Sequence, residues 1–259
     1  MKLKLYQVDA FTSELFKGNP AAVVPLPEWL DDETMQNIGL ENNLSESAFF
    51  VKEGNHYHIR WFTPKVEVPL CGHATLASSY VIFNHLKPDL NKIHFQSKSG
   101  ELIVTKENDL ITLNFPANKP QPAAPHPKIL EAVTTRPKEI LLNKSYLAIF
   151  EDENTVRNMK INVRALDNLN ESGLIISAKG NDVDFVSRFF LPTAGIDEDP
   201  VTGYAHTILT PYWSEKLNKK NLHALQVSKR GGELWLEDLG DRVKISGKAK
   251  LYMIGEIYL

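Results

Sequence analysis

Hydrophobic and polar residues follow one another along most of the chain in the short runs that are typical of β-strands. An alternating run opens the chain, and an apolar run follows the Gly-Asn-Pro turn at 18–20. The first half predicts strands at 3–11, 21–24, 44–51, 56–62, 92–96, 101–106 and 110–115. The second half predicts strands at 140–142, 146–150, 174–177, 183–190, 222–227, 233–237, 243–246 and 251–258.

Helical patterns are fewer than strand patterns. A short helix is predicted at 31–40, where Asp31 or Asp32 can cap it, and another at 163–170. Longer apolar runs at 76–84 and 207–217 each follow a glycine-containing loop. The chain is therefore expected to adopt an α+β fold with one long helix in each half, wrapped by a curved sheet.

The two loops before these longer helices repeat one another. Pro-Leu-Cys-Gly-His-Ala-Thr at 69–75 matches Pro-Val-Thr-Gly-Tyr-Ala-His at 200–206, an offset of 131. The segment 97–102 recurs at 228–234 with the same offset and one inserted glycine, and 60–64 resembles 188–192. A repeat of this length indicates two similar lobes related by internal duplication rather than a solenoid.

A proline-rich segment separates the two copies. Five prolines, at 116, 120, 122, 125 and 127, disfavour both a helix and a central strand there. The sequence thus predicts an N-terminal lobe at 1–117, a linker at 118–127 and a C-terminal lobe at 128–259. The last predicted strand can cross back to the N-terminal lobe.

Composition narrows the class of protein. The formal net charge is −3 and no basic block stands out, which disfavours nucleic acid as a partner. No apolar run reaches the roughly 20 residues of a membrane helix, and the first residues read as a strand rather than a signal peptide. Cys71 is the single cysteine, so a disulfide within the chain is excluded and a reducing cytoplasm is expected.

The repeated loops suggest the chemistry of the ligand. A helix start leaves backbone N–H groups unpaired and carries partial positive charge, which favours an anion. Gly72 and Gly203 would open the two helices, so we expect backbone donors around both to hold a carboxylate.

Four ordered motifs resemble the PhzF family of phenazine-biosynthesis isomerases. They are Gly-Asn-Pro at 18–20, Ser-Glu-Ser-Ala-Phe at 45–49, Cys-Gly-His-Ala-Thr at 71–75 and Glu-Asp-Pro-Val-Thr-Gly at 198–203. The resemblance covers nearly the whole chain. It implies the diaminopimelate epimerase-like fold, in which each lobe is a β-barrel around a helix and the site lies in the cleft. It also implies cofactor-free isomerisation of a small carboxylate-bearing metabolite by proton transfer, in a homodimer.

The resemblance makes Glu46 the general acid and base. Glu46 precedes an apolar strand, and aromatic neighbours such as Phe49 would raise its pKa toward the useful range. An alternative from the residues alone is a helix capping box formed by Asn43 and Glu46.

The resemblance also assigns roles to His73 and Asp199, which would hold substrate and assist proton transfer. His73 lies at a helix start, whose partial positive charge should lower the imidazole pKa and keep the ring neutral. Asp199 can equally serve as a helix N-cap. Gly18, Asn19, Pro20, Gly72, Gly203 and Tyr204 complete the predicted substrate-binding residues.

Two positions depart from relatives of this fold. Tyr204 stands where PhzF relatives have serine, so it can restrict the cleft or pack against the lobe. Related epimerases use two opposed cysteines, but the counterpart of Cys71 is Thr202, which excludes that mechanism. Cys71 is expected to be a small buried packing residue.

Two other functions stay open. The chain can be a non-catalytic small-molecule binding member of the same fold, with Tyr204 narrowing the cleft. His56 and His58 could lie on one strand face like metal ligands, but no third ligand is evident, and no metal site is predicted.

Overall fold

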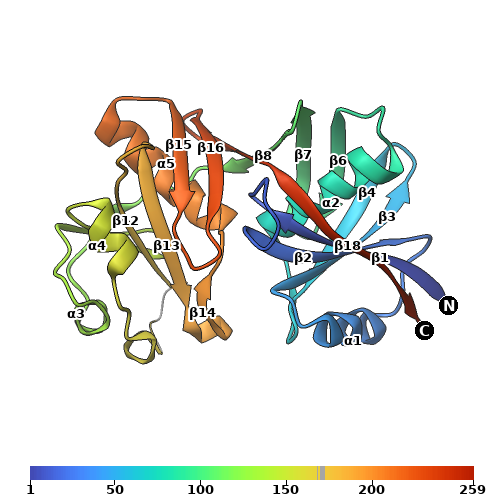
Figure 1. The fold of residues 1–259 in the computed structure, drawn as a ribbon, viewed down its shortest axis with the longest axis horizontal. Helices are drawn as coiled ribbons and strands as arrows, with labels where there is room; N and C mark the ends of the chain where they lie inside the picture. The colour runs from blue at the N-terminus through green and yellow to red at the C-terminus, as the bar shows by residue number, and fades with distance from the viewer. Residues whose placement is uncertain (168, 170–172) are drawn as a thin grey trace. The chain divides into compact units, whose positions relative to one another are not determined.

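The structure is a computed structural model that describes residues 1–167, 169 and 173–259. The chain forms two compact units (Figure 1). Unit 1 contains residues 1–114 and 246–259, and unit 2 contains residues 115–245. The C-terminal segment belongs to unit 1, which is the crossing of the last strand that the sequence left open.

Unit 1 is a sheet with two helices. Its strands are β1 (Lys2–Ala10), β2 (Asn19–Leu26), β3 (Glu46–Glu53), β4 (His56–Phe62), β5 (Glu67–Val68), β6 (Lys92–Ser97), β7 (Gly100–Glu107), β8 (Leu110–Pro116) and β18 (Ala249–Tyr258). Its helices are α1 (Asp32–Asn42) and α2 (Gly72–Val81), which continues into the π-helical turn η1 (Ile82–Leu86).

Unit 2 is built in the same way from shorter strands. They are β9 (Gln121–Pro122), β10 (Glu139–Leu142), β11 (Tyr146–Ile149), β12 (Leu174–Lys179), β13 (Phe185–Leu191), β14 (Ile196–Asp199), β15 (Asn221–Gln226), β16 (Gly232–Asp238) and β17 (Arg242–Gly247), which ends in unit 1. The helices are α3 (Pro127–Ala132), α4 (Glu153–Asn158) and α5 (Gly203–Leu217), with 3₁₀ turns η2 (Val163–Leu166) and η3 (Pro192–Ala194).

The order of strand pairings is the same in both units. In unit 1, β1–β2 is antiparallel, β2–β3 parallel, β3–β4 antiparallel, β4–β6 parallel and β6–β7 antiparallel. Unit 2 repeats these senses in β10–β11, β11–β12, β12–β13, β13–β15 and β15–β16. One further strand pairs antiparallel with the first long strand of each unit: β18, from the end of the chain, pairs with β1, and β9, which precedes β10, pairs with β10. The matching topology is what an internal duplication produces.

The barrel expected for each lobe is not confirmed. Among the strands that the structure describes, the pairings within each unit form an open sheet. The established description is a sheet-dominated α+β fold. Apolar side chains fill the core of unit 1 from β1, β2, β3 and α1, and the core of unit 2 from β10 to β13 and the short helices.

Each unit buries its long helix almost completely, although the helices carry hydroxyl groups. In α2, Ser78 and Ser79 are buried and donate to the carbonyls of Ala74 and Thr75, four residues earlier, at 2.8 Å each. In α5, Thr210 does the same toward His206. Because each hydroxyl is satisfied within its own helix, a buried polar helix costs little.

Pro211 lies inside α5, where proline cannot donate to the carbonyl of Thr207. Asn118 from the proline-rich segment supplies the missing bond, since its N–H donates to Thr207 O at 3.0 Å. Its side-chain Nδ2 also donates to the Thr207 hydroxyl at 2.8 Å. The segment predicted as a linker therefore completes the helix, and two of its residues form β9.

Several element boundaries differ from the sequence-based ones. The long helices begin at Gly72 and Gly203, as the repeated loops predicted and four residues before the apolar runs at 76 and 207. Only η2 is helical in the predicted helix 163–170, of which 168 and 170 lie outside the described residues. The pattern missed α3, α4 and the short strands β5, β9 and β14.

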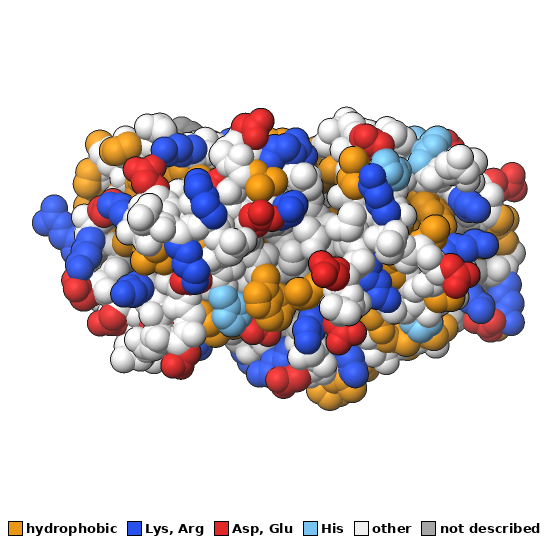
Figure 2. All heavy atoms as spheres, turned by 90° about the horizontal axis from the view of Figure 1, so that it is seen from above, with side chains coloured by type: hydrophobic (Ala, Val, Ile, Leu, Met, Phe, Trp, Pro, Cys, Tyr) orange, Lys and Arg blue, Asp and Glu red, His pale blue; other side chains and the backbone are white. Residues whose placement is uncertain are grey.

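One face of the molecule shows charges of both signs mixed together. On the face drawn in Figure 2, lysine and arginine side chains alternate with acidic ones and with small hydrophobic patches. Among the described residues, every helix is too short or too polar to cross a lipid bilayer.

Candidate active site

In unit 1 the predicted residues Asn19, Glu46 and His73 meet. Asn19 begins β2 and Glu46 begins β3, and these two strands run parallel with Ala21 beside Glu46. Parallel strands start at the same edge of the sheet. His73 is the second residue of α2, so the helix start lies at that edge. The site is thus built where two strands and one helix begin.

Gly18 forms the turn that brings Asn19 to the start of β2. Its φ of +65° lies in the left-handed region, and a Cβ there would overlap the carbonyl oxygen of Ala10. Asn19 directly after it is fully buried. Glycine at this position therefore sets the turn that delivers the Asn19 side chain to His73.

Glu46 and His73 form a close pair. His73 Nε2 lies 3.1 Å from Glu46 Oε2, and both side chains are largely buried. The two atoms are not aligned as a hydrogen bond, and neither has another hydrogen-bond partner among the described residues. Buried polar atoms without partners are rare, and they occur where a ligand supplies the missing bond.

The other ring nitrogen of His73, Nδ1, has two close neighbours. Asn19 Nδ2 lies 3.3 Å from His73 Nδ1, and Cys71 Sγ lies 3.5 Å from the same nitrogen. An amide NH₂ can only donate, so in the neutral form of the ring Nδ1 accepts from Asn19 and the proton is on Nε2, facing Glu46. In the charged form Nδ1 also carries a proton, for which the Cys71 sulfur is the acceptor nearby. Asn19 thus sets the tautomer that presents an N–H to the carboxylate.

The lowered pKa expected from the helix start is not found. Burial favours the neutral ring, but the charges of Cys71 and Glu46 beside it hold the pKa of His73 well above its ordinary value. Burial raises the pKa of the Cys71 thiol to about 11, so this thiol is uncharged at neutral pH. The charge that matters is therefore the Glu46 carboxylate, which favours a protonated His73.

Cys71 is buried and its thiol is a poor nucleophile at neutral pH, as expected for a packing residue. Glu46, Cys71 and His73 place one donor atom each within 4.8 Å of one another. A single ion would need both other donors at one ring nitrogen, yet Cys71 faces Nδ1 and Glu46 faces Nε2. The three residues do not fit a metal centre, and the absence of a metal stays a prediction.

The capping box proposed as an alternative for Glu46 is excluded. Asn43 is the C-cap of α1, in the left-handed conformation with φ of 48°, and Glu46 opens a strand rather than a helix. His56 and His58 both face Glu53, at 3.6 and 3.8 Å, on the exposed end of β4. These histidines are not part of the Glu46–His73 site.

Unit 2 holds a second cluster around Asp199. Asp199 ends β14, and its carboxylate accepts a hydrogen bond from the Thr202 hydroxyl. Thr202 is the N-cap of α5, so Asp199 is not the cap. Gln226 of β15 is fully buried, accepts from Thr202 N at 2.9 Å and donates to Asp199 O at 2.7 Å.

Tyr204 follows Gly203 in the first turn of α5 and is half-buried. Its hydroxyl lies 3.1 Å from Ser145 Oγ, and its ring packs edge-on against Phe189 with centroids 6.3 Å apart. Burial raises the pKa of the phenol above its ordinary value. The side chain is held from its ring to its hydroxyl, so its bulk has a fixed position.

His206 is a buried residue that sequence reasoning did not assign to the site. Its Nδ1 donates to Thr202 O at 2.8 Å, which leaves Nε2 as an unprotonated acceptor without a partner among the described residues. Burial lowers the pKa of this imidazole to about 4. Gln226 and Ser145 were also missed, because single polar residues in strands carry no motif.

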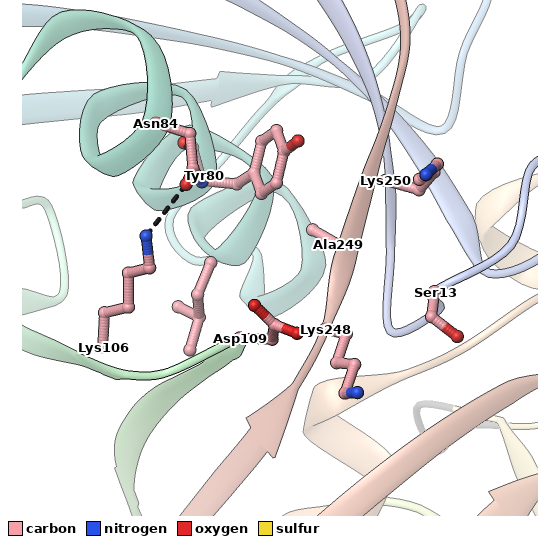
Figure 3. A pocket seen from close by; sticks show the side chains of 9 residues that line it. Ser13, Tyr80, Asn84, Lys106, Asp109, Lys248, Ala249 and Lys250 are labelled. Atoms are coloured by element: carbon pink, nitrogen blue, oxygen red, sulfur yellow. Dashed lines mark hydrogen bonds between the residues drawn. The ribbon is translucent and has the colours of Figure 1, made fainter. Parts of the chain in front are cut away.

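A pocket of about 270 Å³ lies elsewhere in unit 1, against α2, β7 and the start of β18 (Figure 3). Lys106 in its wall is turned to Asn84 Oδ1 at 2.8 Å, whereas Lys248 and Lys250 point to different sides. None of Asn19, Glu46 and His73 lines it. The pocket lacks converging charges and is not the candidate active site.

Comparison with solved structures places the fold among those of PhzF family proteins, and epimerase structures share it. A solved PhzF family structure from Enterococcus faecalis is 48% identical, covers all of both chains and superposes with a TM-score of 0.98. A hydroxyproline epimerase structure from Agrobacterium vitis covers 99% of this chain and 92% of its own, with 10% identity and a TM-score of 0.63. The latter likeness shows the fold alone.

The chain belongs to the phenazine biosynthesis-like protein family, PhzC–PhzF, whose family model matches residues 8–255. A protein of Pseudomonas aeruginosa named as an uncharacterized isomerase is 47% identical over all of both chains. Another uncharacterized isomerase, from Halalkalibacterium halodurans, is 41% identical over all of both chains. The resemblance drawn from the four motifs is confirmed, and the family supports isomerase chemistry.

Proposed function

We propose that the protein is a cofactor-independent isomerase or epimerase that moves a proton on a small carboxylate-bearing metabolite, with Glu46 as acid and base. The observation that carries this proposal is the Glu46–His73 pair, 3.1 Å apart, buried and with unsatisfied polar atoms. Isomerase names among relatives that match the entire chain support the reaction type.

The chemistry follows from the charges at the site. The Glu46 carboxylate removes a proton from a carbon of the substrate, and negative charge spreads onto the substrate carboxylate. A protonated His73 and the backbone N–H groups at the start of α2 lie where that charge is stabilised. Glu46 then returns the proton to another carbon, which isomerises the substrate, or to the same carbon from the same side, which only exchanges the proton. Epimerisation would need a second acid that delivers a proton to the opposite side of that carbon.

The remaining predicted residues have supporting roles in this proposal. Gly18, Asn19, Pro20 and Gly72 shape the binding site of unit 1, and Asn19 also orients His73. Asp199 and Gly203 belong to the unit 2 cluster, and their part in substrate binding stays a prediction. Tyr204 limits the size of the substrate, because its bulk is fixed by Ser145 and Phe189.

The test is proton exchange with solvent. Purified protein in heavy water is incubated with but-3-enoate, whose isomerisation moves a proton from C2 to C4, and with L-alanine as a simple α-proton donor. Proton NMR then follows loss of C–H signal. We expect exchange with wild type, a loss of at least about 10²-fold in Glu46→Gln, and near wild-type exchange in Glu53→Gln at the other end of β3.

A non-catalytic binding protein is the alternative, and the intact Glu46–His73 pair and the isomerase names of relatives do not favour it. It predicts binding of the acids without any exchange. Equal exchange in wild type and Glu46→Gln would instead reject the role of Glu46.

The resemblance also implies a homodimer. We expect light scattering to give about twice the chain mass of 29.2 kDa. A single-chain mass over the whole concentration range would reject this expectation.

A further inference from the structure

Among the described residues, an arginine with two hydrogen bonds to one glutamate occurs once in each unit, at equivalent places in the repeat. We call each such pair a fork. Arg60 Nε and Nη2 donate to the two carboxylate oxygens of Glu67, both at 2.9 Å. Arg188 repeats this geometry with Glu198, at 2.7 and 3.0 Å. All four side chains are at least three-quarters buried. Two-point pairing of this kind fixes both orientation and distance.

Each arginine is also held by a helix. The third nitrogen of Arg60 donates to Asp32 in the first turn of α1 at 2.8 Å. The third nitrogen of Arg188 donates to the carbonyls of Val156 and Met159 at the end of α4, at 3.2 and 2.7 Å. Each guanidinium group is therefore fixed in place, so it does not shift together with its glutamate.

Each guanidinium group also lies over an aromatic ring. Arg60 lies over Phe62 at 5.2 Å, and Arg188 lies over Phe190 at 5.0 Å. Phe62 and Phe190 come from the same strands as the arginines, β4 and β13. A planar guanidinium on an aromatic face is a further geometric restraint that lysine does not reproduce.

The two glutamates sit on the short strands that lead into the helix starts. Glu67 lies in β5, before Cys71 and His73, and Glu198 lies in β14, directly before Asp199. In both units a serine from the following hairpin donates to the proline carbonyl two residues after the glutamate. These contacts are Ser99 to Pro69 O at 2.8 Å and Ser228 to Pro200 O at 2.7 Å.

Strand geometry links the fork to the direction of the site residue in unit 2. Neighbouring residues of a strand point to opposite faces. Since Arg188 holds Glu198 on one face, Asp199 must point to the other, where it lies opposite Phe189 and accepts from Thr202. A rotation of β14 would therefore turn Asp199 away from its cluster.

We infer that Arg60 and Arg188 are positioning residues: through Glu67 and Glu198 they fix the strands that carry His73 to Glu46 in unit 1 and Asp199 to Thr202 in unit 2. This inference rests on the proposed function for its meaning in catalysis, but the placement itself is testable without a substrate. General stabilisation is a weaker explanation of the forks. Replacing a buried ion pair by apolar residues is often neutral for stability.

The unit 1 fork is tested with Arg60→Lys and Arg60→Met, and with Lys2→Met as the control. Lys2 pairs with Glu256 at 2.8 Å, away from the site strand. Hydrogen exchange of peptide 67–73 should become about tenfold faster in both Arg60 variants, while peptides from β2 and β3 stay unchanged. The imidazole titration of His73, followed by NMR, should move down as the ring leaves Glu46.

The unit 2 fork is tested with Arg188→Lys and a matched control, Arg157→Lys. Arg157 pairs with Glu153 at 2.6 Å within α4, so the control breaks an arginine–glutamate contact that holds no site strand. Exchange of peptide 196–202 should become about tenfold faster in Arg188→Lys only. With but-3-enoate as the probe, turnover at saturation should fall about 10²-fold, with a smaller change in KM.

The Arg→Lys variants keep the positive charge but lose the two-point geometry. They therefore distinguish a role of the arginines in positioning from a role in charge balance alone. If Arg60→Lys and Arg188→Lys keep wild-type local exchange and the wild-type His73 titration, the forks do not position the site. If exchange rises equally in core peptides, the forks only stabilise the units. If the probe is not turned over by wild type while the local changes occur, the proposed function fails and the positioning stands.

Discussion

The Glu46 carboxylate and the His73 imidazole, from strand β3 and helix α2, meet with 3.1 Å between Oε2 and Nε2. Neither group can leave this contact for water, because both are largely buried. The Glu46 carboxylate therefore favours the charged form of His73.

The first prediction concerns this influence. In Glu46→Gln the charge beside His73 disappears, and burial remains as the main influence on the ring. We expect the pKa of His73 to fall from well above its ordinary 6.5 to below it. NMR titration of the ring protons measures this shift. An unchanged His73 titration would show that Glu46 does not supply the charge.

The second prediction concerns the single thiol. Because burial holds the pKa of Cys71 near 11, we expect iodoacetamide to leave the folded protein unmodified at pH 7.5 and to label it fully in denaturant. Cys71→Ala should keep most of the proton-exchange activity, since Asn19 still fixes the His73 tautomer. Rapid labelling of the native protein would contradict the buried thiol.

The third prediction concerns stability against acid. His206 has a pKa of about 4 in the folded chain and 6.5 as its ordinary value, so between these values the unfolded chain binds a proton that the folded chain does not. Stability should therefore fall as pH drops from 6.5 to 4, by about 3 kcal/mol from this residue.

Urea unfolding at pH 7, 5.5 and 4.5 measures this loss, with His206→Asn as the comparison. Asparagine can still donate to Thr202 O but does not titrate. The part of the decrease in unfolding free energy with falling pH that is assigned to His206 should therefore disappear in this variant. If the unfolding free energy depends on pH equally in both proteins, other groups cause the loss of stability in acid.

The fourth prediction concerns Tyr204. In Tyr204→Ser the restriction on substrate size is removed, so larger carboxylates should bind, while the melting temperature changes little because the residue is half-buried. Tyr204→Phe keeps the ring on Phe189 and loses the bond to Ser145, and it should retain the wild-type ligand range. A loss of ~3 kcal/mol or more in Tyr204→Ser with an unchanged ligand range would make Tyr204 a core residue instead.

The sequence was informative where a pattern is local or repeated. Alternation located most long strands, and the duplicated Gly72 and Gly203 loops located both helix starts. The position of Glu46 at a strand start followed from the apolar run after it, and its role followed from the family resemblance. Its contact with His73 is seen only in the structure. The charge on His73 did not, because it depends on a carboxylate that is distant along the chain and on burial that no local pattern reports.

Residues that act through tertiary contacts were invisible in the sequence. Gln226 is a single glutamine in an alternating strand, yet it bonds both Asp199 and Thr202. The two arginines of the forks, Arg60 and Arg188, lie in the repeated segments of the sequence. Only the structure shows which glutamates they bind. Asn118 completes α5 from a segment whose composition indicated an unstructured linker.

Strand β18 pairs with β1 along its whole length, from Lys2 opposite Tyr258 to Ala10 opposite Ala249 (Figure 1). This strand is synthesised after all of unit 2. At ~5–20 residues per second, ribosomes reach it roughly ten seconds after finishing β8. During that time β1 presents an unpaired edge, which is the kind of surface that chaperones and neighbouring nascent chains bind. Unit 2 can complete its own sheet first, so the half that carries Glu46 and His73 matures last.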